Sequence, residues 1–283
     1  MKYGTSLPLV AAMDHAALRD FAQTLDGAGF DYLTVSGHLL STEPGRFPDR
    51  PAMMYAGPFY EPLTLFAYLA ATTERLRFRT SVLLLPLFPT VAVARQATEL
   101  SLLSGGRFEL GVAVGWNPLE YQAAGQDFHT RGRRLAEQIV VLRRLWTEPF
   151  VTFHGRWHTL EGVGLNRLPQ APIPIWMGGT DERALRRAAR LADGWIPLGD
   201  PSEIMPRLRR YVADAGRDPS AFGLTARLTA GPDGPAAWVA EARRLVGVGA
   251  THLSIAAPPD LAPAQALARI VEARKTLVAE LGG

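Results

Sequence analysis

A pair of consecutive glycines marks the clearest candidate ligand site in the sequence. Residues 175–177 read as a short apolar strand, and Gly178, Gly179 and Thr180 connect it to a segment of helical periodicity that starts at Asp181. Glycine lets backbone N–H groups approach a phosphate closely, and a helix N-terminus favours negative charge. The turn therefore predicts a phosphate site, the alternative being an ordinary turn capped by Asp181. It lacks the G-x-G-x-x-G pattern of dinucleotide-binding folds.

His38 has the most informative position of the six histidines. It follows an apolar run at residues 32–35 and Gly37, where a strand of a parallel sheet would end. A histidine there can hydrogen-bond a redox ring or relay a proton near neutral pH. A structural role is the alternative. His154 and His158 belong to a segment that resembles a tight hairpin, and we expect both to be exposed, with no metal bound.

A second glycine turn offers groups that could contact a planar ligand. Val114 and Gly115 end an apolar run, and Trp116 and Asn117 follow. Gly115 permits close backbone approach, whereas Trp116 could stack on a ligand and Asn117 could hydrogen-bond it. The alternative is a glycine turn with a tryptophan in the core.

The composition excludes several kinds of chemistry. The 283 residues include no cysteine, which removes disulfides, thiolate nucleophiles and cysteine-ligated metals. No Ser/His/Asp arrangement and no pair of acids at a recognisable spacing points to hydrolysis. The formal net charge is +3, and arginines are scattered over the predicted helices, so we expect no nucleic-acid partner. Arg131, Arg133 and Arg134 open one helix as a solvated face, from which one side chain could reach an anionic cofactor tail.

The overall composition is typical of a globular cytoplasmic protein. Hydrophobic residues make up 47% of the chain and charged residues 20%. The first eight residues read as a strand rather than a secretion signal. The most apolar stretch, residues 81–94, is shorter than the roughly 18–20 residues of a membrane span, so we expect no membrane association. The excess of Arg over Lys, with abundant Ala, Gly and Pro, favours a bacterial source.

Short apolar runs alternate with longer segments of helical periodicity, which is the pattern of repeated βα units. The expected strands are residues 3–7, 32–35, 77–84, 108–114, 175–177, 194–196, 224–228 and 252–255. The expected helices are residues 14–28, 61–73, 90–103, 131–146, 181–192, 202–215, 235–247 and 263–281. Eight such units predict an α/β fold, a TIM (β/α)8 barrel formed by residues 1–283 as a single domain.

Two segments exceed what a minimal barrel needs. Residues 39–60 form an expected insertion after strand 2, and residues 150–174, with a hairpin-like motif at 153–158, form one before strand 5. Long loops in compact domains are usually functional, and the first would lie at the C-terminal face, where barrel active sites are built. Its apolar side chains are Met53, Met54, Phe59 and Tyr60. They predict a pocket for a hydrophobic substrate or a dimer contact.

Six ordered segments carry a resemblance to a known family. They are Gly-Phe-Asp-Tyr-Leu-Thr-Val-Ser-Gly-His at 29–38, Arg-Thr-Ser-Val at 79–82, Ser-Gly-Gly-Arg-Phe-Glu-Leu-Gly-Val at 104–112, Gly-Trp-Asn-Pro-Leu-Glu-Tyr at 115–121, Pro-Ile-Trp-Met-Gly-Gly at 174–179 and Ala-Asp-Gly-Trp at 192–195. Taken in this order, they resemble the luciferase-like monooxygenases over nearly the whole chain, in particular their F420-dependent branch.

The resemblance implies roles at two of the strand ends. His38 is similar to the catalytic histidine near the reactive part of the deazaflavin, where relatives often have Asp in place of Gly37. Ser81 and Val82 are similar to a pair joined by a non-prolyl cis peptide that supports the cofactor ring.

The other two glycine turns also acquire roles from the resemblance. The segment of Val114, Gly115, Trp116 and Asn117 matches the one that lines the ring. Met177, Gly178, Gly179 and Thr180 resemble the phosphate-binding turn. Some F420 dehydrogenases carry a catalytic Glu where Trp116 stands, which argues against a sugar-phosphate dehydrogenase of that type.

The function implied is that of an F420-dependent oxidoreductase, transferring a hydride between the deazaflavin and an unidentified organic substrate. The alternative is an FMN-dependent monooxygenase of the same fold, using O2 and reduced flavin from a separate reductase. A second alternative is a barrel that binds flavin or another small ligand without turnover. Relatives commonly form dimers, so a homodimer is expected.

Overall fold

Eight parallel strands close into a barrel in the computed structural model, which describes residues 1–8, 13–51, 54 and 57–282. The strands are β1 (Lys2–Ser6), β2 (Tyr32–Gly37), β3 (Arg77–Leu83), β4 (Phe108–Val112), β7 (Ile175–Gly178), β8 (Gly194–Ile196), β9 (Gly223–Thr229) and β10 (His252–Ala256). They pair in the order β1-β10-β9-β8-β7-β4-β3-β2. The predicted TIM-barrel fold is therefore confirmed.

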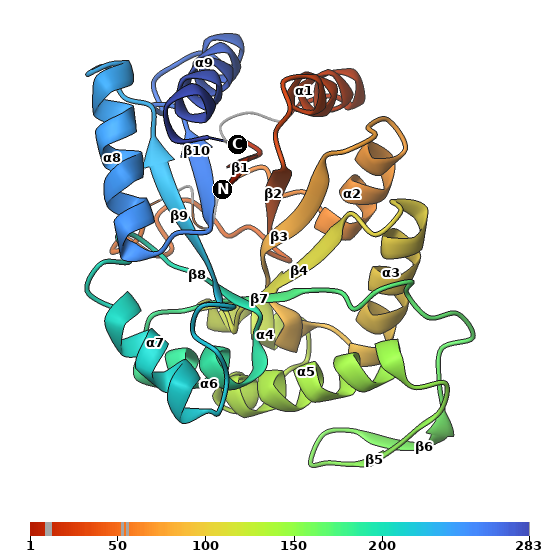
Figure 1. Ribbon diagram of the computed structural model, residues 1–283. Helices are drawn as coiled ribbons and strands as arrows, with labels where there is room; N and C mark the ends of the chain where they lie inside the picture. The colour runs from red at the N-terminus through yellow and green to blue at the C-terminus, as the bar shows by residue number, and fades with distance from the viewer. Residues whose placement is uncertain (9–12, 52–53, 55–56, 283) are drawn as a thin grey trace.

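Helices surround the strands on all sides (Figure 1). The helices that sequence periodicity predicts are α1 (His15–Gly27), α2 (Pro62–Ala70), α3 (Thr90–Leu103), α5 (Arg131–Thr147), α6 (Glu182–Leu191), α7 (Met205–Asp214), α8 (Pro235–Val248) and α9 (Pro263–Leu281). An additional helix, α4 (Pro118–Ala123), has 6 residues, too few to show a periodic pattern. Within the described part of the chain, no helix is long and apolar enough to cross a membrane.

In α1 a capping residue precedes an apolar stripe. Asp14 accepts a hydrogen bond from the N–H of Ala17 at 2.8 Å, which satisfies a free donor of the first turn. Leu18, Phe21 and Leu25 follow at helical spacing, and each is at most 6% exposed. Burial of this stripe holds the helix against the barrel.

β3 carries one more residue than its neighbour β4. The register pairs Arg79 with Glu109 and next Leu83 with Val112, so that four steps along β3 match three along β4. The register between β3 and β2 shifts over the same part of β3. This is a β-bulge, which re-aims side chains and is common beside active sites.

The side chain of Thr80 replaces the backbone ladder at the bulge. Its hydroxyl donates to the carbonyl oxygen of Gly111 at 2.6 Å and accepts from the N–H of Gly111 at 2.8 Å. A Cβ on residue 111 would overlap the carbonyl oxygen of Thr80, so the close approach of β3 and β4 requires glycine there.

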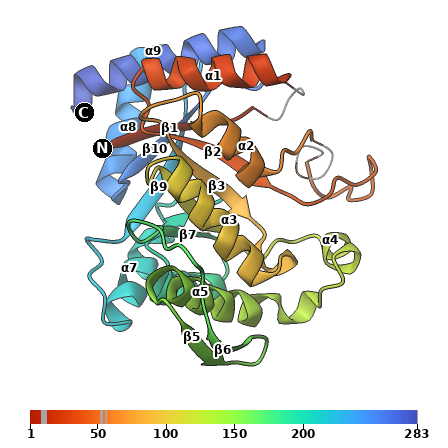
Figure 2. The same ribbon diagram turned by 90° about the vertical axis from the view of Figure 1, so that its right-hand side faces the viewer.

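The insertion after β2 lies at the C-terminal end of the barrel strands, as predicted. Figure 2 shows the segment between β2 and α2 on the same end of the barrel as α4, with both chain termini at the opposite end. The N–H of Leu39 in this insertion donates to the Glu120 carboxylate of α4 at 2.7 Å. The insertion is thereby tied to the helix that follows β4.

The insertion before β7 forms the antiparallel pair β5 (Val151–His154) and β6 (Thr159–Val163), which confirms the predicted hairpin. The side chain of His154 is 65% exposed, as expected. The expectation that His158 is exposed is wrong. Its side chain is 14% exposed, with Nδ1 at 2.8 Å from Glu137 Oε1 and Nε2 at 2.6 Å from Thr90 Oγ1. Both partners are distant in sequence, in α5 and α3, so no local pattern reveals these contacts.

Replacing Thr80 with Val should destabilise the barrel, because Gly111 would keep a buried N–H and a buried carbonyl without their present partner. A buried polar group left unsatisfied costs about 1–3 kcal/mol, so we expect the free energy of unfolding to fall by about 2–4 kcal/mol in urea denaturation. Thr98→Val is the matched control, since Thr98 is also 0% exposed but its hydroxyl bonds the carbonyl of Ala94 in its own helix. Equal losses in the two variants would contradict the role assigned to Thr80.

Glu137 makes the stability of the docked hairpin depend on pH. Burial raises the pKa of its carboxyl, but hydrogen bonds from His158 and from the N–H groups of Trp157 and Arg156 outweigh burial and hold the pKa below its ordinary value. A carboxyl with a lowered folded pKa stabilises the protein above its unfolded pKa, and the contribution is lost as pH falls through the folded pKa. Glu137→Gln should therefore lower the free energy of unfolding near neutral pH, with the difference from wild type shrinking below about pH 4.

The matched control for this pH dependence is Glu161→Gln on the same hairpin. Glu161 contacts His154 at 3.3 Å with its side chain 64% exposed, so its loss should change stability little at any pH. A wild-type-minus-Glu137→Gln difference that stays constant between about pH 7 and about pH 3 would refute the assignment.

Candidate active site

Four neighbouring strands bring the predicted site residues to one end of the barrel. In the order β2, β3, β4 and β7, their C-terminal ends carry Gly37, the pair Ser81–Val82, Val114 and Gly178. A Cβ built on Gly178 would lie 3.4 Å from Cγ1 of Val82 and 3.5 Å from Cβ of Ala113. The ends of β3, β4 and β7 are thus in close contact.

The peptide bond between Ser81 and Val82 is cis, as the resemblance implied. Both side chains are partly exposed. They belong to the bulge that Thr80 holds, so the bulge presents them at the mouth of the barrel.

Gly37 fills a position with little room for a side chain. A Cβ there would lie 3.1 Å from Cδ1 of Leu83 and 3.2 Å from Cγ of Pro62. An aspartate, which the resemblance led us to consider at this place, would force one of these neighbours to move. The glycine is therefore matched to the packing of this chain.

The turn after β7 has the geometry of a strand leading into a capped helix. Gly179 has a φ of +113°, and a Cβ on it would lie 2.8 Å from Cβ of Ala184 in α6. Trp195 donates from Nε1 to the carbonyl oxygen of Gly179 at 2.8 Å. Thr180 is partly exposed, whereas Met177 is 0% exposed and belongs to the barrel core. The turn is held rigidly, with the first turn of α6 beside it.

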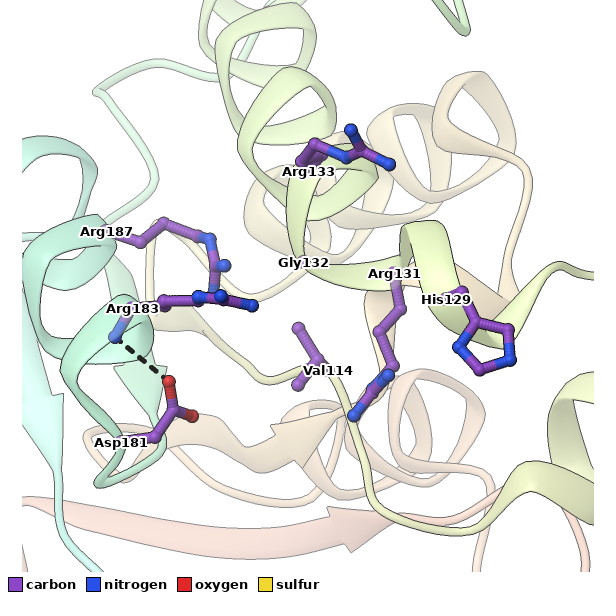
Figure 3. Close-up of a pocket in the computed structure, with 8 residues that line it drawn as sticks. All are labelled: Val114, His129, Arg131, Gly132, Arg133, Asp181, Arg183 and Arg187. Atoms are coloured by element: carbon purple, nitrogen blue, oxygen red, sulfur yellow. Dashed lines mark hydrogen bonds between the residues drawn. The ribbon is translucent and has the colours of Figure 1, made fainter.

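A cavity of about 630 Å³ opens between this turn and the end of β4. It is lined by Val114, His129, Arg131, Gly132, Arg133, Asp181, Arg183 and Arg187 (Figure 3). Val114 is a predicted ring contact, and Asp181 follows the predicted phosphate turn. The cavity therefore lies between the end of β4 and the turn after β7, two segments that are distant in sequence and become neighbours when the barrel closes.

The three arginines at the start of α5 have different surroundings. Arg131 and Arg133 line the cavity. The expectation that Arg134 belongs to a solvated face is wrong, because it is 8% exposed and donates from Nη2 to the carbonyl oxygen of Pro86 at 2.9 Å. Burial lowers the pKa of Arg134. Its role is to hold the segment after β3 against α5.

His38 pairs with a carboxylate that sequence reasoning missed. Its Nδ1 lies 3.0 Å from Oε2 of Glu120, and the two side chains are 16% and 1% exposed. The other carboxylate oxygen accepts from the N–H groups of Leu39 and Leu40 at 2.7 and 3.3 Å. Glu120 therefore fixes both the histidine ring and the chain that leaves β2.

The sequence contains a signal near Glu120 that favours a different role. Asn117 and Glu120 have the spacing of a capping box, in which the acid returns to the N–H of the capping residue. In the structure Asn117 does cap α4, accepting from the N–H of Leu119 at 2.9 Å, but Glu120 turns to the insertion instead. Asn117 is 2% exposed, and its contact with a ligand stays a prediction.

Tyr121 ties α4 to the end of β4. Its hydroxyl donates to the carbonyl oxygen of Val114, and burial raises the pKa of the phenol. Gly115, with a φ of +69°, packs on Leu84, since a Cβ there would lie 2.9 Å from Cδ1 of that leucine. The helix that carries Glu120 is thus fixed to the same strand end that borders the large cavity.

Trp116 lies half-buried under the insertion rather than in the barrel core. Phe47 packs edge-on against it with ring centroids 4.8 Å apart, and the Arg50 guanidinium lies 4.3 Å from the ring centroid. Trp116 thus makes aromatic and guanidinium contacts in this chain, while the carboxylate beside His38 comes from Glu120.

A second cavity, of about 330 Å³, borders His38 on the side of the insertion. Leu39, Leu40, Phe59, Tyr60 and Phe88 are its large apolar lining residues. His38 also packs on Phe59, with ring centroids 4.8 Å apart. Phe59 and Tyr60 thus lie where a pocket was predicted, and the predicted pocket residue Met53 lies outside the described residues.

Comparison with known proteins agrees with this geometry. The luciferase-like monooxygenase family matches residues 1–280. An uncharacterized protein of Mycobacterium tuberculosis is 37% identical over 206 residues, covering 69% of this chain and 71% of that protein. The F420-dependent hydroxymycolic acid dehydrogenase of the same species is 30% identical over 230 residues, covering 78% and 61%. The pyrimidine monooxygenase RutA of Allorhizobium ampelinum is 33% identical over 177 residues, covering 58% and 48%.

Solved structures agree on the fold. An F420-dependent secondary alcohol dehydrogenase in complex with an F420-acetone adduct has a TM-score of 0.81 to this chain, at 15% identity and with 98% of both chains covered. The match to the family extends over the barrel and its insertions together. This chain belongs to the luciferase-like monooxygenase family, whose members are F420- or flavin-dependent oxidoreductases and monooxygenases.

Proposed function

We propose that this protein is an F420-dependent oxidoreductase that transfers a hydride between the deazaflavin and a small organic substrate. The observation that carries the proposal is the His38–Glu120 pair, with 3.0 Å between Nδ1 and Oε2, at the mouth of the barrel. A histidine whose Nδ1 is anchored by a buried carboxylate can exchange a proton through Nε2. Hydride transfer to a carbonyl, or from an alcohol, requires such a proton exchange.

The residues at the mouth fit the shape and charge of the cofactor. The glycines at 178 and 179 lead into the first turn of α6 with no side chain of their own, which suits a phosphate. The partly exposed Ser81–Val82 bulge offers a surface for one face of a planar ring. Arginines line the cavity between the turn after β7 and the end of β4, where an anionic side chain of the cofactor would extend.

When bound, the deazaflavin supplies the carbon that gives or accepts the hydride. The protein supplies position and a proton path. Because Glu120 is a carboxylate, it accepts the Nδ1–H of His38, and Nε2 remains a free acceptor. In alcohol oxidation, Nε2 takes the hydroxyl proton; in carbonyl reduction, the same nitrogen returns a proton to the oxygen. The buried Glu120 keeps the proton on Nδ1 of His38 in both directions, so that the exchanged proton is the one on Nε2.

The cavity beside His38 supports a small substrate with both apolar and polar groups. Its lining combines Leu39, Phe59 and Phe88 with Ser41 and Glu61, and its volume is about 330 Å³, near the lower end of the range of about 300–1,000 Å³ of small-molecule pockets. His38 also borders it and can exchange a proton with a hydroxyl or carbonyl group. This combination favours a small alcohol or ketone.

The alternative is an FMN-dependent monooxygenase that uses O2 and reduced flavin from a separate reductase. It is supported by the 33% identity to RutA, but that match covers 58% of this chain, compared with 78% for the F420-dependent dehydrogenase. A homodimer is proposed for either function. The exposed side chains of Val91, Val140 and Phe150 offer apolar surface for subunit contact.

Titration of the purified apoprotein with F420 and, separately, with FMN tests the cofactor. We expect the protein to quench F420 fluorescence with a dissociation constant of about 1 μM or below. FMN should bind more weakly. Gly179→Asp should abolish binding, since a side chain at φ +113° next to Ala184 blocks the turn and adds negative charge.

Gly216→Asp is the matched control for the titration. Gly216 also has a positive φ, +72°, but nothing lies within 4 Å of the position of its Cβ, and it follows α7. Its substitution carries the same backbone strain without touching the site, so cofactor affinity should remain. Tighter binding of FMN than of F420 would overturn the proposal in favour of the oxygen-using reaction.

Glu120→Gln should abolish proton exchange while cofactor affinity stays within about threefold of wild type. The amide oxygen must continue to accept from Leu39 and Leu40, so the amide NH2 faces Nδ1 of His38. That donor forces the proton of His38 onto Nε2, the wrong tautomer for accepting one. We expect kcat for alcohol oxidation to fall about 10²–10⁴-fold, as in His38→Gln.

Asp127→Asn serves as the control for charge removal near α4. Asp127 caps a short turn by accepting from the N–H of His129 at 2.8 Å and is exposed, so kcat should be unchanged. A Glu120→Gln variant with wild-type kcat and unaltered pH dependence would show that Glu120 has a structural role alone.

A further inference from the structure

Two helices present arginines to the large cavity from opposite sides. Arg131 and Arg133 belong to the first turn of α5, and Arg183 and Arg187 lie one turn apart on α6. Figure 3 shows Arg183 and Arg187 extending from α6 toward α5, with Arg131 beside Val114. Both helices also direct their N-terminal ends to this region, which adds positive potential.

The positive charge of the cavity is not neutralised by the protein. Asp181 is the single carboxylate among the described residues that line it, and its Oδ1 caps α6 by accepting from the N–H groups of Arg183 and Ala184, each at 3.0 Å. Within the described chain, none of the four guanidinium groups forms an ion pair with a carboxylate. By contrast, Arg186 on the same helix pairs with Glu182 at 2.7 Å.

The arginines are held close together despite their like charge. A Cβ on Gly132 would lie 2.6 Å from Nη2 of Arg187, so this guanidinium reaches across to the backbone of α5. Burial lowers the pKa of Arg187, and Arg190 and Arg131 lower it further against the opposing effect of Asp181. The Nε of Arg131 is buried without a hydrogen-bond partner. A bound anion would relieve the repulsion and satisfy these donors.

We propose, building on the F420-dependent function above, that this cavity binds an oligoanionic tail with at least two negative groups, namely the carboxylates that follow the phosphate of the deazaflavin side chain. A lone phosphate carries about two negative charges at most, fewer than four guanidinium groups can neutralise when Asp181 is the one carboxylate lining the cavity among the described residues. The volume of about 630 Å³ also falls well inside the range of about 300–1,000 Å³ for ligand pockets. The arginines thereby make tail length a determinant of cofactor affinity.

The test compares the affinities of the apoprotein for two forms of F420, one with a long oligoglutamate tail and one without glutamate. Each affinity is measured by the quenching of F420 fluorescence. Wild type should bind the long-tailed form about tenfold more tightly or better, with a steeper loss of affinity as salt increases. The Arg183→Gln/Arg187→Gln double variant should bind both forms with nearly equal affinity and lose the extra salt dependence. Its unchanged affinity for the tail-less form would show that the ring and phosphate contacts remain.

Arg186→Gln is the matched control, because it removes a charge from α6 on a side chain that is paired with Glu182 and does not line the cavity. Arg186→Gln should keep the wild-type preference for the long tail. The single variant Arg183→Gln, by contrast, should weaken this preference. Equal wild-type affinity for the two forms, or a preference that survives the double variant, would overturn the tail site while leaving the F420 function intact. Binding of FMN and of neither F420 form would overturn both.

Discussion

In the buried space between β3 and β4, the hydroxyl of Thr80 bonds both the N–H and the carbonyl of Gly111, at 2.8 and 2.6 Å. This pair of bonds lets β3 hold one residue more than its neighbour without leaving buried backbone groups unsatisfied. The extra residue places Ser81 and Val82 at the mouth, with Val82 beside Gly178 at the end of β7. The arrangement of the remaining site residues depends on this bulge, since it lies between the strands that carry them.

The mouth of the barrel is divided into two chemically different halves. On one side of the bulge, His38 and residues of the insertion line the cavity in which we propose that the organic substrate binds. On the other side, arginines of α5 and α6 enclose one suited to anions. α4 connects the halves, because Glu120 holds His38 while the adjacent Tyr121 holds the carbonyl of Val114. Movement of α4 would therefore disturb both cavities together.

The position of Glu120 bears on two residues, Gly37 and Trp116, at which this chain differs from the expected family pattern. These are the two positions at which the resemblance led us to expect an acid in some relatives, and in this chain Gly37 packs against Leu83 and Trp116 against Phe47. The carboxylate beside His38 comes from Glu120 of α4, where its desolvation is offset by hydrogen bonds from Leu39 and Leu40. The proposed acid–base role of His38 therefore does not depend on an acid at position 37 or 116.

The sequence by itself determined the barrel and gave candidate site residues. Apolar runs alternating with helical periodicity specify parallel strands, and the ends of such strands meet at one face, so His38 and the turn at 178–180 could be proposed from local patterns, whereas Ser81–Val82 was proposed only from the resemblance to a known family. The partners of those residues were decided by tertiary structure. Glu120 approaches His38 across 82 residues, and α5 meets α6 in the arginine cavity, because barrel closure and helix packing set distances that no periodic pattern encodes. For the same reason Arg134 is buried and His158 half-buried against distant elements, although both read as surface residues.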